Sequence, residues 1–239
     1  MWQFMSQVSD LHGERDIHRI TAKSLRDKNL DLTERDYLII CGDFGLVWYY
    51  PETKGYETDQ YWLNWLANKP WTTLFVDGNH ENFDLLETFP IEKWNGGNVH
   101  HIVRNKVIHL MRGQIFYLEG KSIFTFGGAE SHDKNYRTQS INWWPQELPK
   151  VEEENIGIKN LIDNRLQVDY IITHCAPYSL EDRVFRIYNS NTLTELFQML
   201  YDEISFKHWY CGHYHISETF NNVTCLFNKI IPLGKKIDK

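Results

Sequence analysis

FVDGNHENFD, residues 75–84, is the stretch in which an apolar run changes abruptly into a dense set of polar side chains. The run TTLFV ends at Val76, and a carboxylate, a glycine, an amide, an imidazole and a second carboxylate follow directly. A short apolar run with such a boundary is typical of a buried strand. Ligands of open α/β sheets bind at the carboxyl ends of strands, so we interpret these polar residues as part of a binding site.

The same pattern recurs elsewhere in the chain, in MSQVSDLHGE, YLIICGDFG, DYIITHCAP and KHWYCGHYH. Together with GNHE, these strand ends present a set of oxygen and nitrogen ligands: Asp10, His12, Asp43, Asn79, His174, His213 and His215. A set without a thiolate suits first-row divalent metals better than a structural zinc site. Seven ligands exceed the need of one tetrahedral ion, and a carboxylate such as Asp43 can bridge two ions.

The spacing of these residues has a physical reason. In D-x-H and H-x-H, residues two apart at an extended strand end point the same way and can face one metal cluster. Glycines 42, 78 and 212 would permit the sharp turns that lift the ligands to the rim. Single histidines are more often core or surface residues than ligands, and we interpret the following in that way: His18, His100, His101, His109, His132 and His208.

Strands and helices alternate along the chain, which predicts an α/β architecture. Apolar runs predict strands at 37–40, 72–76 and 170–172, and a first strand at 2–8 is less apolar than usual because it carries Gln3, Ser6 and Gln7. Helical periodicity predicts helices at 17–28, 59–68 and after an N-cap at Asn191. QIFYLEGKSIFTF and ISETFNNVTCLF read as hairpins, so we expect parallel pairing early in the chain and antiparallel pairing later. Residues 130–149 have no clear period and are interpreted as a long loop.

Length and composition set limits on the protein class. The chain of 239 residues suits one domain with a large core. Its formal charge of -7, without a basic stripe, argues against a dedicated nucleic-acid surface. The sequence contains no apolar run of about 18 residues, so we expect no transmembrane helix. The first residues lack the features of a signal peptide. The 4 cysteines form no C-x-x-C pair, so we expect small buried side chains in a reduced, cytoplasmic protein.

The ordered series SDLHG, GDFG, GNHE, THCAP and GHYH resembles the calcineurin-like metallophosphoesterases over residues 10–215, most of the chain. GDFGLVW, WNGG, HLMRGQ, GGAESHDKNYR and WWPQE are similar to a bacterial and phage branch of that family. GDFGLVW lacks the G-D-x-V-D-R-G continuation of the serine/threonine protein phosphatases. The resemblance implies one domain, 1–239, folded as a four-layer α/β/β/α sandwich of two mixed sheets, with a loop or cap segment near 130–165.

The resemblance also implies roles for individual residues. It makes Asp10, His12 and His215 ligands of a first divalent ion, and Asn79, His174 and His213 ligands of a second. Asp43 matches the bridging aspartate, His80 matches the histidine that contacts the substrate phosphate and protonates the leaving group, and Glu81 matches its supporting partner. Mn, Fe, Zn and Mg all suit this ligand set.

The implied reaction is hydrolysis of a phosphate mono- or diester by a hydroxide that bridges the two ions. The alternative is a catalytically inactive protein-binding scaffold with the same fold, but such a scaffold should have lost ligands. Nucleotide and phosphoprotein substrates both remain compatible with the sequence. LVWYYPETKGYETDQYW offers aromatic rings that either stack a base or pack in the core.

The long loop offers one further candidate. If the strand at 122–126 lies in the same layer as the ligand strands, the loop after it reaches the same rim. Arg137 could then grip a phosphate through two parallel hydrogen bonds, and Asp133 and His132 could orient Arg137 or contact the substrate themselves. The alternative for Arg137 is a surface salt bridge.

Overall fold

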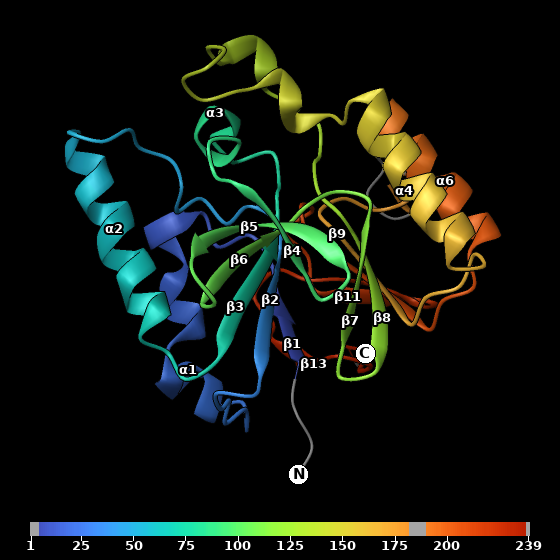
Figure 1. Ribbon diagram of the computed structural model, residues 1–239, viewed down its shortest axis with the longest axis horizontal. Coiled ribbons are helices and arrows are strands. Elements are labelled where there is room, and N and C mark those ends of the chain that lie inside the picture. Colours follow the sequence, from blue (N-terminus) through green and yellow to red (C-terminus); the bar gives the residue numbers. More distant parts are fainter. Residues whose placement is uncertain (1–4, 182–189, 238–239) are drawn as a thin grey trace.

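Two mixed sheets lie face to face, and helices cover their outer faces (Figure 1). The computed structural model describes residues 5–181 and 190–237. The first sheet has the order β13 (Ile231–Pro232), β1 (Met5–Val8), β2 (Tyr37–Cys41), β3 (Thr72–Val76), β6 (Val107–Leu110), β5 (Gly97–Val103) and β4 (Ile91–Trp94). The second has the order β11 (Glu218–Phe220), β12 (Val223–Cys225), β10 (His208–Cys211), β9 (Tyr170–Thr173), β8 (Lys121–Phe126) and β7 (Gln114–Leu118).

Parallel strands form the centre of both sheets. Strands β1, β2, β3 and β6 pair in parallel in the first sheet, and β8, β9, β10 and β12 do so in the second. Antiparallel strands occupy the edges, including the two predicted hairpins, β7–β8 and β11–β12. The expected change from parallel to antiparallel pairing along the chain was therefore wrong, because each hairpin adds an edge strand to a parallel core.

The outer layers are helical. Helices α1 (Ala22–Arg26) and α2 (Lys54–Ala67) cover the first sheet, and α4 (Val151–Asp163) and α6 (Thr192–Glu203) cover the second (Figure 1). Short helices complete the described chain: α3 (Phe83–Leu86), α5 (Tyr178–Leu180) and the 3-10 turns η1 (Gly13–Arg15), η2 (Ile17–Ile20), η3 (Lys134–Tyr136) and η4 (Pro145–Glu147).

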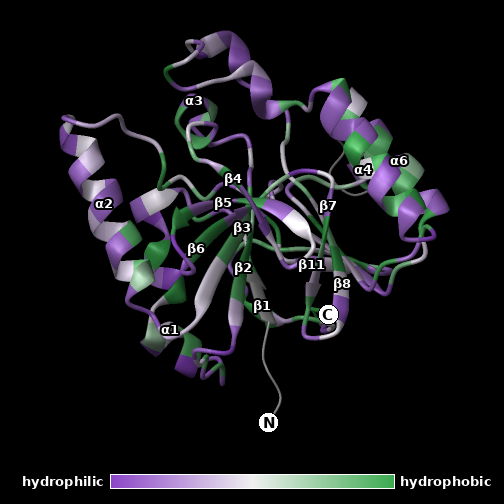
Figure 2. Ribbon diagram, in the orientation of Figure 1, coloured by the Kyte–Doolittle hydropathy of each residue, from purple (hydrophilic) through white to green (hydrophobic). Residues whose placement is uncertain are grey.

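Alternation along the buried strands builds three apolar cores. On β2, Leu38 and Ile40 pack toward α2, whereas Ile39 and Cys41 enter the core between the sheets. On the far side, Phe124 lies close to Gly157 of α4, and Trp209 packs against Phe197 of α6. Apolar residues accordingly concentrate in the strands and on the inner helix faces (Figure 2). The predicted four-layer α/β/β/α sandwich is confirmed.

The helix predictions were correct in place but not in extent. The expected helix at 17–28 is divided into η2 and α1, with Thr21 accepting a hydrogen bond from the Ser24 amide at the boundary. Helix α2 begins at Lys54, five residues before the predicted start at 59, because Thr53 caps it. Asn191 caps α6 as expected. Of the predicted first strand, residues 2–4 lie outside the described part of the chain.

Helix α4 was not predicted. Its outward face carries Val151, Ile156 and Ile162, which are 64%, 44% and 58% exposed. Apolar residues on the solvent side obscure the helical period on which a prediction depends. The preceding segment, 130–149, is irregular apart from η3 and η4, and it passes over the same end of the sheets as α3 (Figure 1).

Candidate metal centre

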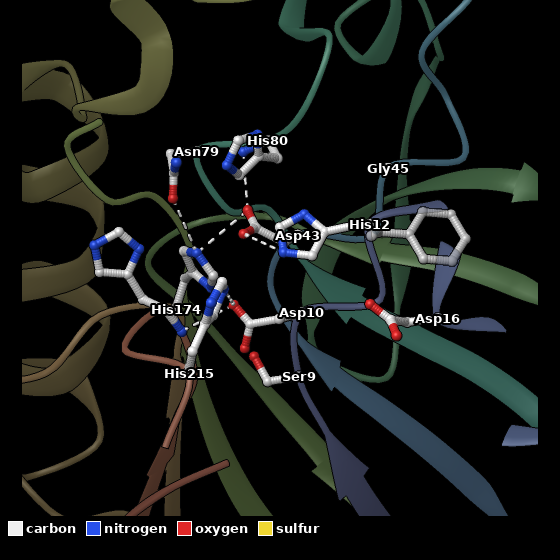
Figure 3. A network of polar contacts seen from close by, with 12 residues as sticks. Ser9, Asp10, His12, Asp16, Asp43, Gly45, Asn79, His80, His174 and His215 are labelled. Carbon is white, nitrogen blue, oxygen red and sulfur yellow. Dashed lines mark hydrogen bonds and ion pairs between the residues drawn. The ribbon is translucent and has the colours of Figure 1, made fainter. Parts of the chain in front are cut away.

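The loops after β1, β2, β3, β9 and β10 meet at one rim of the sandwich (Figure 3). Hydrogen bonds join the two sheets there. The amide of His213 donates to Asp10 Oδ1 at 3.1 Å, and His174 Nδ1 lies 2.8 Å from the Cys41 carbonyl oxygen. The predicted strand-end residues therefore converge although they come from five separate parts of the chain.

Asp43 lies at the middle of this cluster. Its Oδ1 atom is 3.2 Å from His174 Nε2, and its Oδ2 atom is 3.8 Å from His12 Nε2 (Figure 3). A separation of 3.8 Å is too long for a hydrogen bond. Two ligands held ~2.1 Å from one ion at a tetrahedral angle would lie roughly 3.4 Å apart, so both distances suit shared coordination.

The described residues contain overlapping groups in which one ligand atom of each member lies within 4.8 Å of the others. These groups are Asp10 with His12 and His215, His12 with Asp43 and His80, and Asp10 with Asp43 and His174. Asp10, His12 and Asp43 each belong to two groups, so the atoms form one continuous cluster. His/Asp clusters of this kind are compatible with a metal site.

The tautomer of His174 is set by a buried carbonyl. His174 Nδ1 lies 2.8 Å from the Cys41 carbonyl oxygen, which accepts only, so Nδ1 carries a proton. The other nitrogen, Nε2, faces two oxygens at 3.2 Å, Asn79 Oδ1 and Asp43 Oδ1. A neutral His174 presents a lone pair to those two acceptors, and only a proton or a metal cation satisfies all three atoms.

The surroundings of Asp10 are a second indication that this cluster suits a cation. The Asp10 carboxylate is fully buried, and the buried Oδ2 atom has no hydrogen-bond partner among the described residues. Oδ1 lies 3.7 Å from His215 Nε2, again too far for a hydrogen bond. Burial raises the pKa of Asp10 to about 7. A bound cation would hold such a carboxylate in its charged form, so the residues present fit a metal.

Burial keeps two of the imidazoles, His12 and His213, in the neutral form that binds metals. It lowers the pKa of His12 to about 4 and that of His213 well below its usual value. Burial also opposes the charged form of His174, but the nearby Asp43 carboxylate raises the pKa of that histidine to about 9. His213 lies beside this pair, with its ring centroid 5.1 Å from that of His174.

The backbone is strained where the ligands stand. Five of the predicted ligands have positive φ angles: Asp10 (55°), His12 (46°), Asp43 (52°), His213 (69°) and His215 (52°). Such angles are uncommon outside glycine, and they accumulate at functional sites where the surrounding fold enforces them.

The three glycines act in two different ways. Gly42 has a φ of 89°, as the predicted sharp turn requires. Gly78 and Gly212 serve close packing instead, because an added Cβ would lie 2.1 Å from Asp43 Oδ1 and 1.6 Å from Ser9 Oγ, respectively. The turn explanation was therefore correct at Gly42 alone.

His80 and Arg137 form the outer edge of the cluster. The His80 ring stands edge-on to His12, with centroids 4.9 Å apart, and its amide donates to Asp43 Oδ1 at 2.8 Å. Arg137 Nη1 lies 3.4 Å from His80 Nδ1. Because a guanidinium only donates, Nδ1 is the acceptor and neutral His80 carries its proton on Nε2. Burial lowers the pKa of His80, with a further contribution from Arg137.

The segment after β8 reaches the rim as its strand placement suggested, since β8 pairs in parallel with β9. Asp133 Oδ1 lies 2.7 Å from Arg137 Nε, so the predicted pair is present, and the Arg137 side chain is only 16% exposed. His132 lies beside the centre rather than away from it, with its ring centroid 5.7 Å from that of His213.

The stretch 77–84 supports the site on several sides. Asp77 pairs with buried Arg112, its Oδ2 atom lying 2.6 Å from Nη2. Glu81 accepts hydrogen bonds from the amides of Phe44 and Gly45, so it supports the loop that carries Asp43 and not the His80 ring itself. Burial raises the pKa of Glu81 to about 8. Asn82 Nδ2 donates to the Trp48 carbonyl at 2.8 Å.

Two residues of the site were missed by sequence reasoning, Ser131 and Glu147. Asn79 Nδ2 lies 3.1 Å from Ser131 Oγ, and the Ser131 hydroxyl and amide both donate to the Glu147 carboxylate at 2.9 Å. Because the hydroxyl proton is engaged by Glu147, Ser131 Oγ accepts from the Asn79 amide. That contact turns Asn79 Oδ1 toward His174. GGAES and WWPQE contain these residues, but no spacing in the sequence joins them.

The other histidines agree with their interpretation as core residues where they are buried. His109 Nε2 lies 3.1 Å from Asp77 Oδ1, and His208 Nε2 lies 2.7 Å from Thr224 Oγ1. All four cysteines are buried. Within residues 5–181 and 190–237, no helix combines the length and apolar character needed to cross a bilayer.

Comparisons with known proteins agree with this geometry. A family model described as calcineurin-like phosphoesterase matches residues 7–217. A lariat debranching enzyme from Danio rerio is 24% identical over 259 residues, a match that covers 94% of this chain and 43% of the relative. The chain thus spans less than half the length of that relative.

Solved structures show the same fold. One crystal structure has a TM-score of 0.56 at 12% identity and covers 99% of this chain and 97% of its own. Another, a putative 5'-nucleotidase from Staphylococcus aureus in complex with alpha-ketoglutarate, has a TM-score of 0.50 at 14% identity and covers 94% and 48%. At these identities the likeness concerns the fold alone.

Proposed function

This chain belongs to the calcineurin-like phosphoesterase family, and from that premise we propose that it is a binuclear metal-dependent phosphoesterase that hydrolyses phosphate mono- or diesters. The observation that carries the proposal is the position of Asp43 between two sets of ligand atoms. Its two oxygens face different histidines, His12 on one side and His174 on the other. A carboxylate in that position can serve two ions at once.

Asp10, His12 and His215 would hold one ion, and Asn79, His174 and His213 would hold the other. The first set is supported by its mutual distances and by the unpartnered Asp10 Oδ2 atom. The second is supported by the two oxygens, Asn79 Oδ1 and Asp43 Oδ1, that face His174 Nε2 at 3.2 Å. The proposal includes Mn²⁺ among the usable ions and a cytoplasmic location.

When bound, two divalent ions would neutralise the charge of the phosphate and supply a nucleophile from water near neutral pH. The remaining tasks fall to the chain. His80 would hold a proton on Nε2 and donate it to the departing ester oxygen, while Arg137 keeps the proton off Nδ1. Arg137 also adds a positive charge beside the place where a phosphate would lie. The chain needs no covalent intermediate, because phosphoryl transfer depends chiefly on positioning and charge neutralisation.

The alternative, an inactive protein-binding scaffold, predicts a degraded ligand set. All seven predicted ligand residues are in the sequence, and five of them are held at positive φ angles. Both observations favour the enzyme.

The test is hydrolysis of 4-nitrophenyl phosphate and bis(4-nitrophenyl) phosphate by purified protein with Mn²⁺. We expect release of nitrophenolate that ends on chelation and returns with metal. Asp43→Asn should abolish it, whereas Asp163→Asn, which changes an exposed carboxylate paired with Lys159, should not. Equal rates with and without chelator, or in Asp43→Asn, would contradict the proposal.

A further inference from the structure

A cavity of about 620 Å³ opens directly beside the metal centre. Its inner end is lined by His12, His80 and Arg137, and its outer end by Trp48, Tyr49 and Lys54. The volume lies within the range of roughly 300–1,000 Å³ that is usual for small-molecule sites. A molecule whose phosphate reaches the ligand cluster would place its organic part in this cavity.

Two buried polar side chains hold the aromatic wall in place. The amides of Trp48 and Tyr49 both donate to Asp59 Oδ2, at 2.8 and 2.9 Å, and Asp59 is 4% exposed. From the other side, Asn82 donates to the Trp48 carbonyl at 2.8 Å. The backbone of both aromatic residues is therefore fixed by α2 and by the loop after β3.

The rings are positioned but not covered. The Tyr49 ring lies against Gly55, where an added Cβ would come within 2.3–2.5 Å of its ring atoms, yet Tyr49 remains 46% exposed. The Trp48 ring meets Trp144 edge-on, with centroids 5.4 Å apart. Trp144 is in turn held by a 2.8 Å hydrogen bond from Nε1 to Asp84. Rings that are held in place beside a cavity, with exposed surface, offer a stacking platform.

The charges around the cavity argue against a polyanion. Arg15 and Lys54 are offset by Glu14 and Asp59, all on the cavity wall. Arg137, the remaining cation, is engaged by Asp133 and faces His80. The outer end therefore suits an uncharged planar group, attached to a single phosphate at the inner end.

We propose that the cavity is a nucleobase subsite, so that the substrate class is a nucleoside carrying a phosphoester. The base would stack on the wall formed by Trp48 and Tyr49 while the phosphate occupies the metal centre, and this placement rests on the proposed function. Stacking on one aromatic side chain increases affinity by roughly 5- to 150-fold. Tyr49 is the residue on which base recognition depends most directly.

The test compares two ligands that differ only in the base. Phosphonate analogues of AMP and of ribose 5-phosphate, with a methylene group in place of the ester oxygen, have no ester bond to hydrolyse. Calorimetry of the Mn²⁺-loaded protein should show at least about tenfold tighter binding of the AMP analogue. Tyr49→Leu should remove most of that difference and leave the affinity for the ribose analogue unchanged.

Tyr50 provides the matched control, because it is the next residue, is 47% exposed and does not line the cavity. Tyr50→Leu should retain the preference for the base. Gly55→Ala is a second variant, whose added Cβ displaces the Tyr49 ring without removing it and favours the helix. Gly55→Ala should also weaken binding of the AMP analogue while leaving binding of the ribose 5-phosphate analogue unchanged.

Two results would overturn the proposal of a nucleobase subsite: equal affinities of the wild type for the two analogues, or an equal loss of preference for the AMP analogue in Tyr49→Leu and Tyr50→Leu. Because binding is measured without turnover, the two proposals fail separately. Preferential binding of the AMP analogue by a protein that hydrolyses no ester would contradict the proposed function alone. Hydrolysis of bis(4-nitrophenyl) phosphate without any base preference would contradict the subsite alone.

Discussion

Replacing Ser131 by alanine should loosen one metal ion and spare the other. Ser131 is 3% exposed and lies between Asn79 and Glu147, accepting from the first and donating to the second. In Ser131→Ala the Asn79 amide loses the acceptor that directs its oxygen toward His174. The amide can then rotate and turn its NH₂ group toward His174. An NH₂ group does not coordinate a cation, so the second ion would lose the oxygen ligand of Asn79.

The size of the effect follows from two independent estimates. A buried amide left without a partner costs about 1–3 kcal/mol. Loss of a partner that orients a metal ligand typically lowers metal affinity ~10- to 100-fold, which corresponds to about 1.4–2.7 kcal/mol. Both estimates predict that the affinity for the ion held by Asn79, His174 and His213 falls by one to two orders of magnitude.

Calorimetric titration of metal-free protein with Mn²⁺ measures this directly. We expect two binding events in the wild type, and in Ser131→Ala a weakening of about 10- to 100-fold in one event with less than about twofold change in the other. Ser217→Ala is the control, since Ser217 also donates a hydroxyl hydrogen bond, to Asn228, but on the exposed surface. Unchanged binding in Ser131→Ala, or equal weakening of both ions, would refute the role of Ser131.

Three further changes test other parts of the account. His80→Ala should lower kcat by roughly 10² or more while metal content measured by elemental analysis stays the same, and loss of metal would show that His80 is a ligand instead. Arg137→Ala should lower kcat/KM without lowering metal content or Tm, with partial rescue by lysine, which lacks the planar fork; unchanged kinetics would make the contact with His80 structural. Burial lowers the pKa of His208 to about 4. Between pH 4 and 6.5 the folded protein therefore binds fewer protons than the unfolded protein, and acidification lowers the free energy of unfolding. The contribution of His208 to stability is complete above pH 6.5 and is lost as the pH falls through this interval. Denaturant unfolding of His208→Gln should therefore show a pH dependence in that interval that is weaker by up to ~1.4 kcal/mol per pH unit, and identical slopes would contradict the assignment.

The positions of the proposed ligands could be predicted from the sequence because each follows the end of a predicted strand. A parallel strand can be recognised from its apolar residues alone, and its carboxyl end follows directly. Asp43, Asn79 and His174 were placed in this way, without knowledge of which strands are neighbours. The central strands β2, β3 and β9 were predicted for the same reason.

Contacts between distant segments were not readable. Ser131 lies 52 residues from Asn79 and 16 from Glu147, and no local pattern indicates that the three meet. Edge strands such as β4, with Ile91 61% exposed, lack the apolar run that marks a central strand. The direction of strand pairing also depends on connections across the whole fold, which explains why two correct hairpins led to a wrong general expectation.

The metal stoichiometries of the wild type and of Asp43→Asn decide whether the centre holds two ions that share Asp43. After saturation with Mn²⁺ and removal of excess, elemental analysis should find two ions per wild-type chain. Asp43→Asn should hold both ions more weakly, because the shared carboxylate faces His12 and His174 alike. A wild-type stoichiometry that stays at zero under saturating metal, or an Asp43→Asn variant that binds two ions as tightly as the wild type, would contradict a binuclear centre built around Asp43.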